Sequence, residues 1–394
     1  MTPASENIRG TSALPYHLLA QRPNDVEVKV YSYNYNNLNS SKIEEAEKKL
    51  DVEIRLLKQP SWPNWIRMFK LGVIFRVFLR FPLPNYIRIN KKDLELIELE
   101  SYDGVWVYGE EMSRIVRQFH DRKCVHTLPD CESLYYYRML GERFVFKNPL
   151  KFWACTLMYP KFLRMERNFE VSHNIHYHLV GDEDTKFLEN ICPEILAHFI
   201  RHPHYEVAEL KKTISFSQPR IKVLIAGQNN LYMRQDADLI IKDLMVKDNA
   251  ELLKDFFSFT FLGKGWDMHV NGLCKAGYHV SHITFAPDYV EEISKHDIQI
   301  TPICIGTGTK GKVLDALANG LLVIGSWYAL ENIMVESGVS CLQYKNVKEV
   351  VEYLKEIPKD IAKYEFIAER GRRAVFSLHN RASVSKEVFD LFRQ

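Results

Sequence analysis

A glycine-rich turn with two lysines is the segment most suited to chemistry, and it reads ICIGTGTKGKVLDALANGLLVIGS at residues 303–326. Gly306, Gly308 and Gly311 match the G-x-G-x-x-G pattern of dinucleotide-binding turns. Gly306, Gly311 and Lys312 also match most of a P-loop, G-x-x-x-x-G-K. The two patterns describe different sites, so the residues around the turn must decide between them.

Neither pattern is completed by its surroundings. A P-loop needs Ser or Thr after its lysine to bind Mg²⁺, and here that residue is Val313, which disfavours an NTPase. A dinucleotide site needs an acidic residue at the end of the next strand, but that strand ends at Gly325 and Ser326, with Glu331 beyond it. An NAD-dependent oxidoreductase therefore stays an alternative function but is not the preferred one.

Both patterns share a chemistry that the turn does provide. A glycine-rich turn that opens a helix directs backbone N–H groups toward one point, where the helix dipole favours an anion. Gly306 and Gly308 allow a diphosphate to approach the backbone, and Lys310 and Lys312 can add charge-assisted hydrogen bonds. Asp315, one turn after Lys312, could accept hydrogen bonds from sugar hydroxyls; the alternative is a surface Lys312–Asp315 ion pair worth less than about 1 kcal/mol.

The overall composition excludes several classes of protein. The chain has 394 residues, 46% of them hydrophobic, which suits two globular domains. The net charge of +2 gives no global basic field, so nucleic acid is not an expected partner. The seven cysteines are scattered without a C-x-x-C pair, which favours a reducing cytoplasm over a disulfide framework or a zinc site. No apolar run reaches the length of a membrane span and no signal-peptide pattern is present, so we expect a cytoplasmic protein.

One stretch raises the question of a membrane surface. Residues 63–84, PNWIRMFKLGVIFRVFLRFPLP, are apolar, aromatic and basic. As a helix they would spread their cations around the axis, which weakens the case for an interfacial helix. Two interpretations stay open: peripheral contact with the inner face of a membrane through 63–84, and a half-buried helix whose long cations reach solvent.

Short β-branched and aromatic runs alternate with helix-period segments along the whole chain, which is typical of parallel, doubly wound α/β sheets. In the C-terminal half we predict strands at 220–227, 257–263, 278–285, 297–305, 321–326 and 340–344. In the N-terminal half we predict strands at 26–34, 52–57, 103–109, 123–128, 174–181 and 195–200.

The predicted organisation is two Rossmann-like domains facing each other across a cleft. The first covers residues 1–203, a linker follows at 204–219, and the second covers 220–377. A closing helix at about 378–394 would pack back on the first domain. Ligands should bind between the domains, at the carboxyl ends of both sheets.

Residues 297–326, DIQITPICIGTGTKGKVLDALANGLLVIGS, resemble the donor site of GT-B glycosyltransferases of the retaining, sugar-nucleotide-dependent kind, group 1 or family 4-like. In that family a strand, a proline, small residues with glycines and a lysine precede a helix that reads roughly K-x-x-E-A-x-A-x-G, and a strand P-V-I follows. The likeness extends more loosely over the C-terminal half, through 223–230 and FLGKG at 261–265. The N-terminal half matches in pattern only.

The resemblance assigns roles to the turn. Lys312 and the backbone N–H groups of 306–309 would hold the diphosphate, and Asp315 stands where the family has the second Glu of a Glu-x7-Glu pair, which binds ribose. Thr307 replaces the first Glu of that pair, so hydroxyls of Thr307 or Thr309 and backbone amides would substitute for a carboxylate.

The resemblance also implies positions outside the turn. Gly227 matches the turn after the first strand of the donor domain, but relatives often carry a basic pair there and this chain has only Arg234 nearby. The nucleotide base would lie against the strand end at Phe285 to Asp288.

In the N-terminal half, Asp130 follows a strand near the point where relatives carry a His or Asp beside the reacting sugar. Asp130 would orient the acceptor or a donor hydroxyl; the alternative is a helix N-cap worth about 1 kcal/mol. Gly10 and Thr11 resemble the acceptor-side loop. The family opens with a strand before that loop, so the N-terminal sheet is expected to lack its first strand or to fill the gap with another segment.

Two clusters could be mistaken for metal sites. Asp182, Glu183 and Asp184 follow a strand, as the metal-binding D-x-D of the other glycosyltransferase fold does, but they also suit the first turn of a helix. His202 and His204 have no third ligand in sequence, and a hinge role is preferred. We therefore predict no metal site.

We expect a metal-independent enzyme that uses Lys312 and Asp130 and transfers a sugar from a nucleotide-diphosphate donor to a glycan or lipid-linked acceptor, with no further cofactor. The expected setting is polysaccharide or lipid-linked glycan assembly. A sugar-nucleotide epimerase of the same fold, an NAD-dependent oxidoreductase and a non-catalytic nucleotide-sugar-binding protein are the alternatives.

Overall fold

The computed structural model divides into two compact units. Unit 1 comprises Met1–Pro203 and Arg381–Gln394, and unit 2 comprises His204–Asn380, which takes in the predicted linker. The structure describes residues 13–35, 37–60, 72–205, 207 and 213–394. No helix among these residues has both the length and the apolar character that crossing a membrane requires.

Unit 2 contains a six-stranded parallel sheet in the order β12-β11-β10-β7-β8-β9. All six strands predicted for this half are confirmed, each slightly shorter than predicted: β7 (Ile221–Ala226), β8 (Phe257–Leu262), β9 (His279–Ile283), β10 (Ile298–Thr301), β11 (Leu322–Gly325) and β12 (Leu342–Gln343). The chain winds outward from β7 in one direction through β8 and β9, and from β10 in the other. The direction of winding therefore reverses between β7 and β10, where open α/β sheets bind their ligands.

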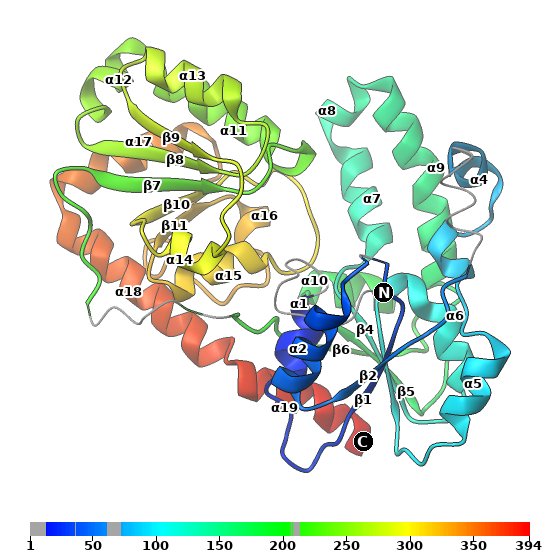
Figure 1. Ribbon diagram of the computed structural model, residues 1–394. Helices are drawn as coiled ribbons and strands as arrows, with labels where there is room; N and C mark the ends of the chain where they lie inside the picture. The colour runs from blue at the N-terminus through cyan, green and yellow to red at the C-terminus, as the bar shows by residue number, and fades with distance from the viewer. Residues whose placement is uncertain (1–12, 36, 61–71, 206, 208–212) are drawn as a thin grey trace. The chain divides into compact units, whose positions relative to one another are not determined.

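Helices cover both faces of this sheet (Figure 1). On one face lie α11 (Leu231–Leu244), α12 (Lys247–Leu253), α13 (Asp267–Lys275) and α17 (Lys348–Glu356). On the other lie α14 (Tyr289–Ile293), α15 (Gly311–Ala318) and α18 (Ile361–Leu378), with α15 packed along α18. Two short helices, α16 (Trp327–Leu330) and η4 (Ile357–Lys359), follow β11 and α17. The two layers enclose the central strands β7, β10 and β11, which explains their mostly apolar sequences, whereas the edge strand β9 has no buried residue.

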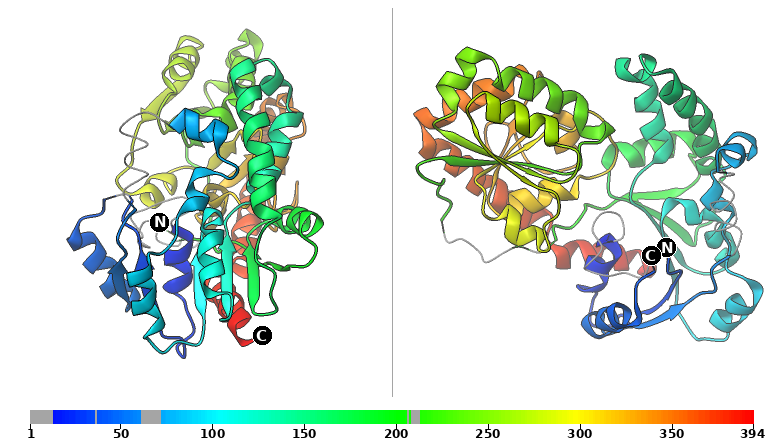
Figure 2. Two further views of the ribbon diagram at one scale, coloured as in Figure 1. Left: turned by 90° about the vertical axis from the view of Figure 1, so that its right-hand side faces the viewer. Right: turned by 45° about the horizontal axis from the view of Figure 1, so that its top comes forward.

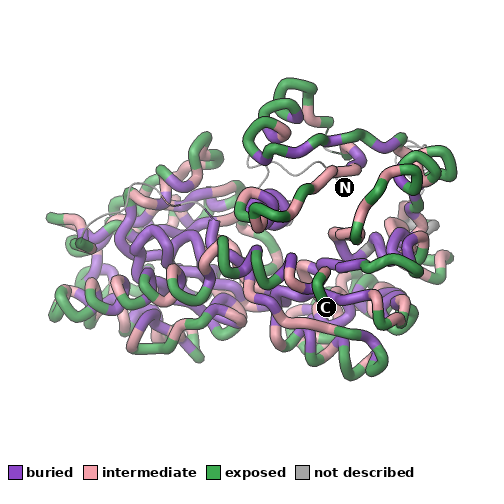
Figure 3. The backbone as a smooth tube through the Cα atoms, turned by 90° about the horizontal axis from the view of Figure 1, so that it is seen from below, coloured by how far each residue is buried: buried purple, intermediate pink, exposed green. Residues whose placement is uncertain are grey.

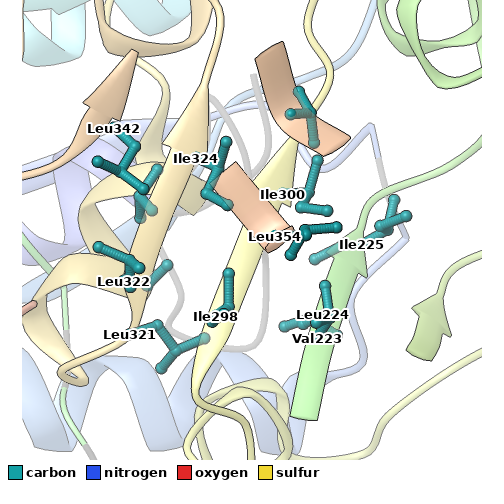
Figure 4. Close-up of a cluster of buried hydrophobic side chains, with 14 of the residues drawn as sticks. Val223, Leu224, Ile225, Ile298, Ile300, Leu321, Leu322, Ile324, Leu342 and Leu354 are labelled. Carbon is teal, nitrogen blue, oxygen red and sulfur yellow. The ribbon is translucent and has the colours of Figure 1, made fainter. Parts of the chain in front are cut away.

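The core of unit 2 forms where side chains of neighbouring strands meet (Figure 4). Val223 of β7, Ile298 and Ile300 of β10 and Ile324 of β11 are all completely buried. β-Branched side chains suit this position because they pack well on a pleated surface and have few rotamers to lose. In the tube of Figure 3 buried residues run along the strands, while exposed residues mark the outer turns of the helices. This rigid sheet fixes the ends of β7 and β10.

Unit 1 contains two parallel sheets, so its strands do not form one doubly wound sheet among the described residues. β3 (Val105–Tyr108), β4 (Cys124–Leu128), β5 (Ile175–Leu179) and β6 (Leu196–Phe199) pair in chain order. β1 (Lys29–Ser32) and β2 (Glu53–Leu56) form a separate pair. No described strand joins β1 to β3, and the predicted strands themselves are confirmed.

The helices of unit 1 begin at residues suited to capping. The side chains of Asn39, Asn90 and Asn148 accept N–H groups from the first turns of α2 (Ser40–Leu50), α5 (Lys91–Glu98) and α9 (Pro149–Glu166). The remaining helices are α1 (Ala13–Leu19), α4 (Gly72–Phe78), η1 (Leu83–Tyr86), η2 (Glu110–Met112), α6 (Ser113–Val116), η3 (Arg117–Phe119), α7 (Glu132–Gly141), α8 (Arg143–Phe146), α10 (Asp182–Ile191), α19 (Arg381–Asp390) and η5 (Leu391–Arg393). The views agree that α7 and α9 lie side by side (Figure 2).

The C-terminal segment belongs to unit 1 because α19 packs against α1. Ser385 donates a hydrogen bond from its hydroxyl to the carbonyl of Leu18 at 2.7 Å, and Val384 and Val388 join Leu14 in a small apolar cluster. The chain therefore crosses back after α18.

Two glycines inside helices test how tightly α18 is packed. A Cβ on Gly371 would lie 2.4 Å from the carbonyl oxygen of Ser340 and 2.8 Å from Leu317 of α15, whereas a Cβ on Gly141 of α7 meets nothing. We expect Gly371→Ala to lower the free energy of unfolding by about 1–3 kcal/mol through overpacking. Gly141→Ala is the matched control and should leave stability unchanged or raise it by up to about 1 kcal/mol. Urea unfolding of both variants measures the difference.

Candidate functional site

The turn after β7 is the first part of the site at the reversal point of the unit 2 sheet. Gly227 has φ +125°, a backbone conformation that side chains rarely allow. Its carbonyl accepts a hydrogen bond from the indole N–H of Trp266 at 2.8 Å, and a Cβ on Gly263 would lie 2.2 Å from the same oxygen. The turn is thus fixed from outside by β8 and its loop. Its conformation requires glycine.

The loop between β10 and α15 is held by side chains that donate hydrogen bonds to its own carbonyl groups. Gly308 has φ +61°, which turns the chain back. The ammonium of Lys310 donates to the carbonyls of Thr307, at 2.5 Å, and Gly308, at 2.9 Å. The amide of Asn332 donates to the Gly308 carbonyl at 3.2 Å. Lys310 therefore stabilises the loop in this structure, and its predicted contact with a phosphate would require those bonds to be exchanged.

Lys312, in the first turn of α15, has a different environment. Its Nζ lies 3.7 Å from the sulfur of Met233, and a Cβ on Gly227 would lie 2.6 Å from the same nitrogen. Among the described residues no oxygen is recorded as accepting from this ammonium. Burial, with a smaller contribution from Lys310, lowers the pKa of Lys312 to about 8. The side chain of Lys312 is half-buried, and an ammonium in such a place beside a sulfur atom can bind an anion.

The other residues predicted in this loop are mostly enclosed. Thr307 and Asp315 are 8% and 4% exposed, so the alternative of a surface ion pair between Lys312 and Asp315 is wrong: the carboxyl group is buried. Gly306 lies against Lys310, whose Cε would be 2.9 Å from an added Cβ. Thr309 completes the loop between Gly308 and Lys310. The structure thus brings the 306–310 loop, Lys312 and Gly227 into one region.

Two predicted residues lie apart from this region. The guanidinium of Arg234 is exposed and donates to the carbonyl of Asn229 at 3.3 Å, so it supports the turn after β7. Phe285 follows β9 at the sheet edge, is 75% exposed, and is separated from β7 by the whole of β8. Its contact with a nucleotide base stays a prediction.

Sequence reasoning missed two contributors. Met233 faces the Lys312 ammonium from α11, and Asn332, whose own φ is +65°, holds the 308 carbonyl from beyond α16. Neither residue belongs to a binding motif. Each comes from a segment that is distant in sequence and reaches the site only through tertiary packing. A positive φ at a non-glycine residue cannot be read from sequence.

In unit 1, Asp130 precedes the first turn of α7. The N-cap position falls on Cys131, so the interpretation of Asp130 as the N-cap is wrong. The first N–H groups of the helix are instead bound by carboxylates from other elements: Cys131 N–H by Asp184 at 2.8 Å and Ser133 N–H by Glu166 at 3.0 Å. The carboxylate of Glu110 accepts a hydrogen bond from the backbone N–H of Glu132, the first residue of α7, at 3.4 Å. These buried acids compensate the helix dipole and fix the segment that carries Asp130.

Glu166 and Glu110 are also hydrogen-bonded to each other, and Glu166 binds the Ser133 hydroxyl. Burial raises the pKa of the Glu166 carboxyl above its ordinary value. Two buried carboxyl groups in contact share a proton more readily than they hold two charges. We therefore expect the two carboxyl groups to share one proton, which the Glu166 variants below test.

The carboxylates and histidines considered as metal ligands have structural partners. Asp182–Asp184 begin α10, as preferred from sequence; Lys186 pairs with Asp182 at 2.6 Å and Glu183 at 3.3 Å, while Asp184 is fully buried. The imidazoles of His202 and His204 lie 2.7 Å from the carbonyls of the residues that follow them. Within the described residues no three such side chains gather as a metal site requires. Gly10, Thr11 and residues 63–71 lie outside the described part.

No protein-family model and no curated protein matches the sequence. Solved structures match along nearly the whole chain. HepE of Anabaena in complex with UDP and glucose is 11% identical, with a TM-score of 0.61 over 99% of this chain and 97% of that chain. WaaG, a glycosyltransferase involved in lipopolysaccharide biosynthesis, is 12% identical, with a TM-score of 0.60 over 97% and 96%. Sucrose-phosphate synthase from Thermosynechococcus elongatus is 13% identical, with a TM-score of 0.59 over 100% and 95%. At such identities the comparison establishes the fold.

Replacing Lys312 with Met should stabilise the protein in a pH-dependent way. Because the pKa of the amine falls from 10.5 to about 8 on folding, its cost to stability is full below pH 8 and fades as the pH rises to 10.5. We expect Lys312→Met to raise the free energy of unfolding by about 1–3 kcal/mol at pH 7, with the gain disappearing near pH 10.5. Urea titrations across this pH range measure it. The exposed Lys348→Met is the control; a destabilised Lys312→Met at pH 7 would contradict the assignment.

Two variants of Glu166 distinguish a protonated acid from a carboxylate that must be charged. Glu166→Gln imitates the protonated form and should change stability by less than about 1 kcal/mol at pH 7. Glu166→Leu leaves the Ser133 N–H and Glu110 without their partner and should cost about 1–3 kcal/mol. Thermal unfolding of both, beside the exposed Glu183→Gln, reports the order. Equal losses in the Gln and Leu variants would show that the charge is needed.

Proposed function

Since the protein has the GT-B fold, we propose that it is a glycosyltransferase, which moves a sugar from a nucleotide-diphosphate donor to an acceptor hydroxyl. The observation that carries the proposal is the Lys312 ammonium, held at the reversal point of the unit 2 sheet with a sulfur atom and a glycine as neighbours. A diphosphate supplies the oxygens that this ammonium lacks. HepE, of the same fold, was solved with UDP, with UDP and glucose, and with UDP-glucose.

In the proposed reaction the bond between the anomeric carbon and the β-phosphate oxygen breaks while the acceptor oxygen bonds to that carbon. The leaving diphosphate gathers negative charge, and its departing oxygen takes up the proton that the acceptor hydroxyl gives up. Lys312 and the N–H groups of 306–309 would stabilise this charge without reorganising, because the loop bonds already fix them. Asp315 would bind ribose, with the Thr307 and Thr309 hydroxyls near the donor sugar.

The same reasoning supports finer proposals. A protein ammonium and helix N–H groups provide the positive charge that a metal supplies elsewhere, so we propose metal-independent transfer with no cofactor beyond the donor. Retention of configuration is proposed from the family resemblance, and Asp130 is proposed to orient the acceptor or a donor hydroxyl. WaaG takes part in lipopolysaccharide biosynthesis, which supports a glycan or lipid-linked acceptor here. Contact of residues 63–84 with a membrane is part of this setting.

Ligand binding should restore the charge of Lys312. Because its pKa is about 8 in the free protein, a bound diphosphate should raise that pKa, and binding near pH 8 should therefore take up protons. Calorimetry of UDP binding in buffers of different ionisation enthalpy measures the uptake, which Lys312→Met should abolish. Affinity should weaken above pH 8 in the wild type alone. Binding without proton uptake would place the diphosphate elsewhere.

Transfer itself is tested with purified protein. A thermal-shift screen with UDP-, GDP-, dTDP- and CMP-sugars identifies the donor, because only a bound ligand raises apparent stability. With that donor, Lys312→Met should lower turnover about 10²–10³-fold while the protein stays folded. Lys348→Met should retain full activity. Unchanged turnover in Lys312→Met would refute the role of this residue, and an epimer formed without acceptor would identify the epimerase alternative.

A further inference from the structure

Unit 1 carries six large apolar side chains on α4, α8 and the start of α9 that are exposed to solvent. Three belong to α4: Ile74, Val77 and Phe78, which are 52%, 47% and 82% exposed. Three belong to α8 and the start of α9: Phe146, Leu150 and Trp153, which are 58%, 84% and 68% exposed. These six residues are called the apolar surface below. Large apolar side chains exposed in such numbers on one group of helices indicate an interaction site.

Specific contacts hold α4 against α9. The ammonium of Lys161, which is only 6% exposed, donates to the carbonyls of Val77, at 3.2 Å, and Leu79, and so satisfies the end of α4. The guanidinium of Arg164 donates to the Arg80 carbonyl at 3.0 Å. A buried cation is costly unless it is hydrogen-bonded, so these bonds fix the orientation of α4. The α4 side chains are therefore exposed on a docked helix.

The two halves of the apolar surface face the same side of α9. Leu150, Trp153, Leu157, Lys161 and Arg164 are spaced by three and four residues, so they form one stripe along the helix. Lys161 and Arg164, toward the C-terminal end of α9, bind the end of α4, whereas Leu150 and Trp153, in its first turns, are exposed to solvent. Figure 1 shows α4 beside α9, with α8 at the N-terminal end of α9.

The two segments that carry the apolar surface are rich in basic residues, although Glu142 precedes α8 as its N-cap residue. The segment 72–92 contains Arg76, Arg80, Arg88, Lys91 and Lys92 and no acidic residue. The segment 143–165 contains Arg143, Lys147, Lys151, Lys161 and Arg164 and no acidic residue. The chain as a whole is nearly balanced, with 52 basic and 50 acidic residues, so this local excess is selective. Lys147 is exposed beside Phe146 and Leu150.

We propose that the apolar surface binds the headgroup region of a bilayer of anionic lipids, with Phe78, Phe146, Leu150 and Trp153 entering the interface. Tryptophan and phenylalanine are favoured at that depth, and lysine and arginine beside them attract anionic headgroups. Phe146 packs on Phe152 with ring centroids 5.1 Å apart, so the tip of α8 and α9 is preformed. A protein partner would also bury apolar residues, but the excess of positive charge in these segments favours a negatively charged lipid surface. The inference does not rest on sugar transfer.

Vesicle co-sedimentation without any sugar nucleotide tests the proposal. The wild-type protein should bind vesicles of phosphatidylcholine mixed with phosphatidylglycerol and should bind phosphatidylcholine alone far more weakly. Added salt should reduce binding, because headgroup attraction is screened. The triple variant Phe146→Ser, Leu150→Ser, Trp153→Ser should lose at least about tenfold in partition, since three exposed apolar groups no longer enter the lipid.

The matched control is Leu99→Ser, because Leu99 of unit 1 is 83% exposed and lies outside the apolar surface. It should bind vesicles as the wild type does. A second pair separates charge from apolar contact: Lys147→Glu with Lys151→Glu should weaken binding to anionic vesicles, whereas Lys345→Glu with Lys348→Glu should not. This pair also decides the matter if the triple variant does not fold.

Three outcomes would overturn the proposal. One is equal binding of wild type to neutral and anionic vesicles. Another is equal loss in the Leu99→Ser control and the triple variant. The last is absence of vesicle binding together with self-association that the triple variant abolishes in sedimentation velocity, which would assign the apolar surface to a second copy of the chain.

Discussion

The candidate site depends on one unfavourable interaction, the enclosure of the Lys312 ammonium next to the glycine turn after β7. A Cβ at position 227 would lie 2.6 Å from the Lys312 Nζ, so the absence of a side chain there makes the room for the charge. The φ of +125° at Gly227 excludes most other residues independently. Residues 227 and 312, 85 positions apart in sequence, therefore act as one structural element. Such a cost persists where the surrounding sheet can support it.

The sheet of unit 2 provides that support and was predictable from local patterns. Its central strands are buried on both faces, so they read as short β-branched or aromatic runs ended by glycine or a polar residue, as in β7 before Gly227. The parallel order then places the turns after β7 and β10 together, because the winding reverses between them. Local sequence thus predicted both the fold class and a loop that lies at the reversal point of the sheet.

The side-chain details of the site could not be predicted in the same way. Lys310 and Lys312 are two residues apart and look equivalent in sequence, but the φ of Gly308 brings the loop carbonyls to Lys310 and leaves Lys312 beside Met233. In unit 1 the acids that bind the start of α7 come from three other elements, so an Asp beside the helix start was a natural but wrong choice for the cap. Long-range packing decides both cases.

Lys312 of unit 2 differs from the buried charges of unit 1 in how far the protein itself supplies its partners. Unit 1 neutralises its buried charges internally: Glu166 is bonded to Ser133 and Glu110, and the Lys161 ammonium is taken up by the carbonyls that end α4. A buried charge with such partners holds elements in place and has little capacity left for a ligand. Lys312 in unit 2 has no such oxygen recorded among the described residues, so its interactions are the ones a ligand can complete. Burial alone therefore does not identify a binding residue: Lys161 is the more buried of the two lysines, and its ammonium already has carbonyl partners.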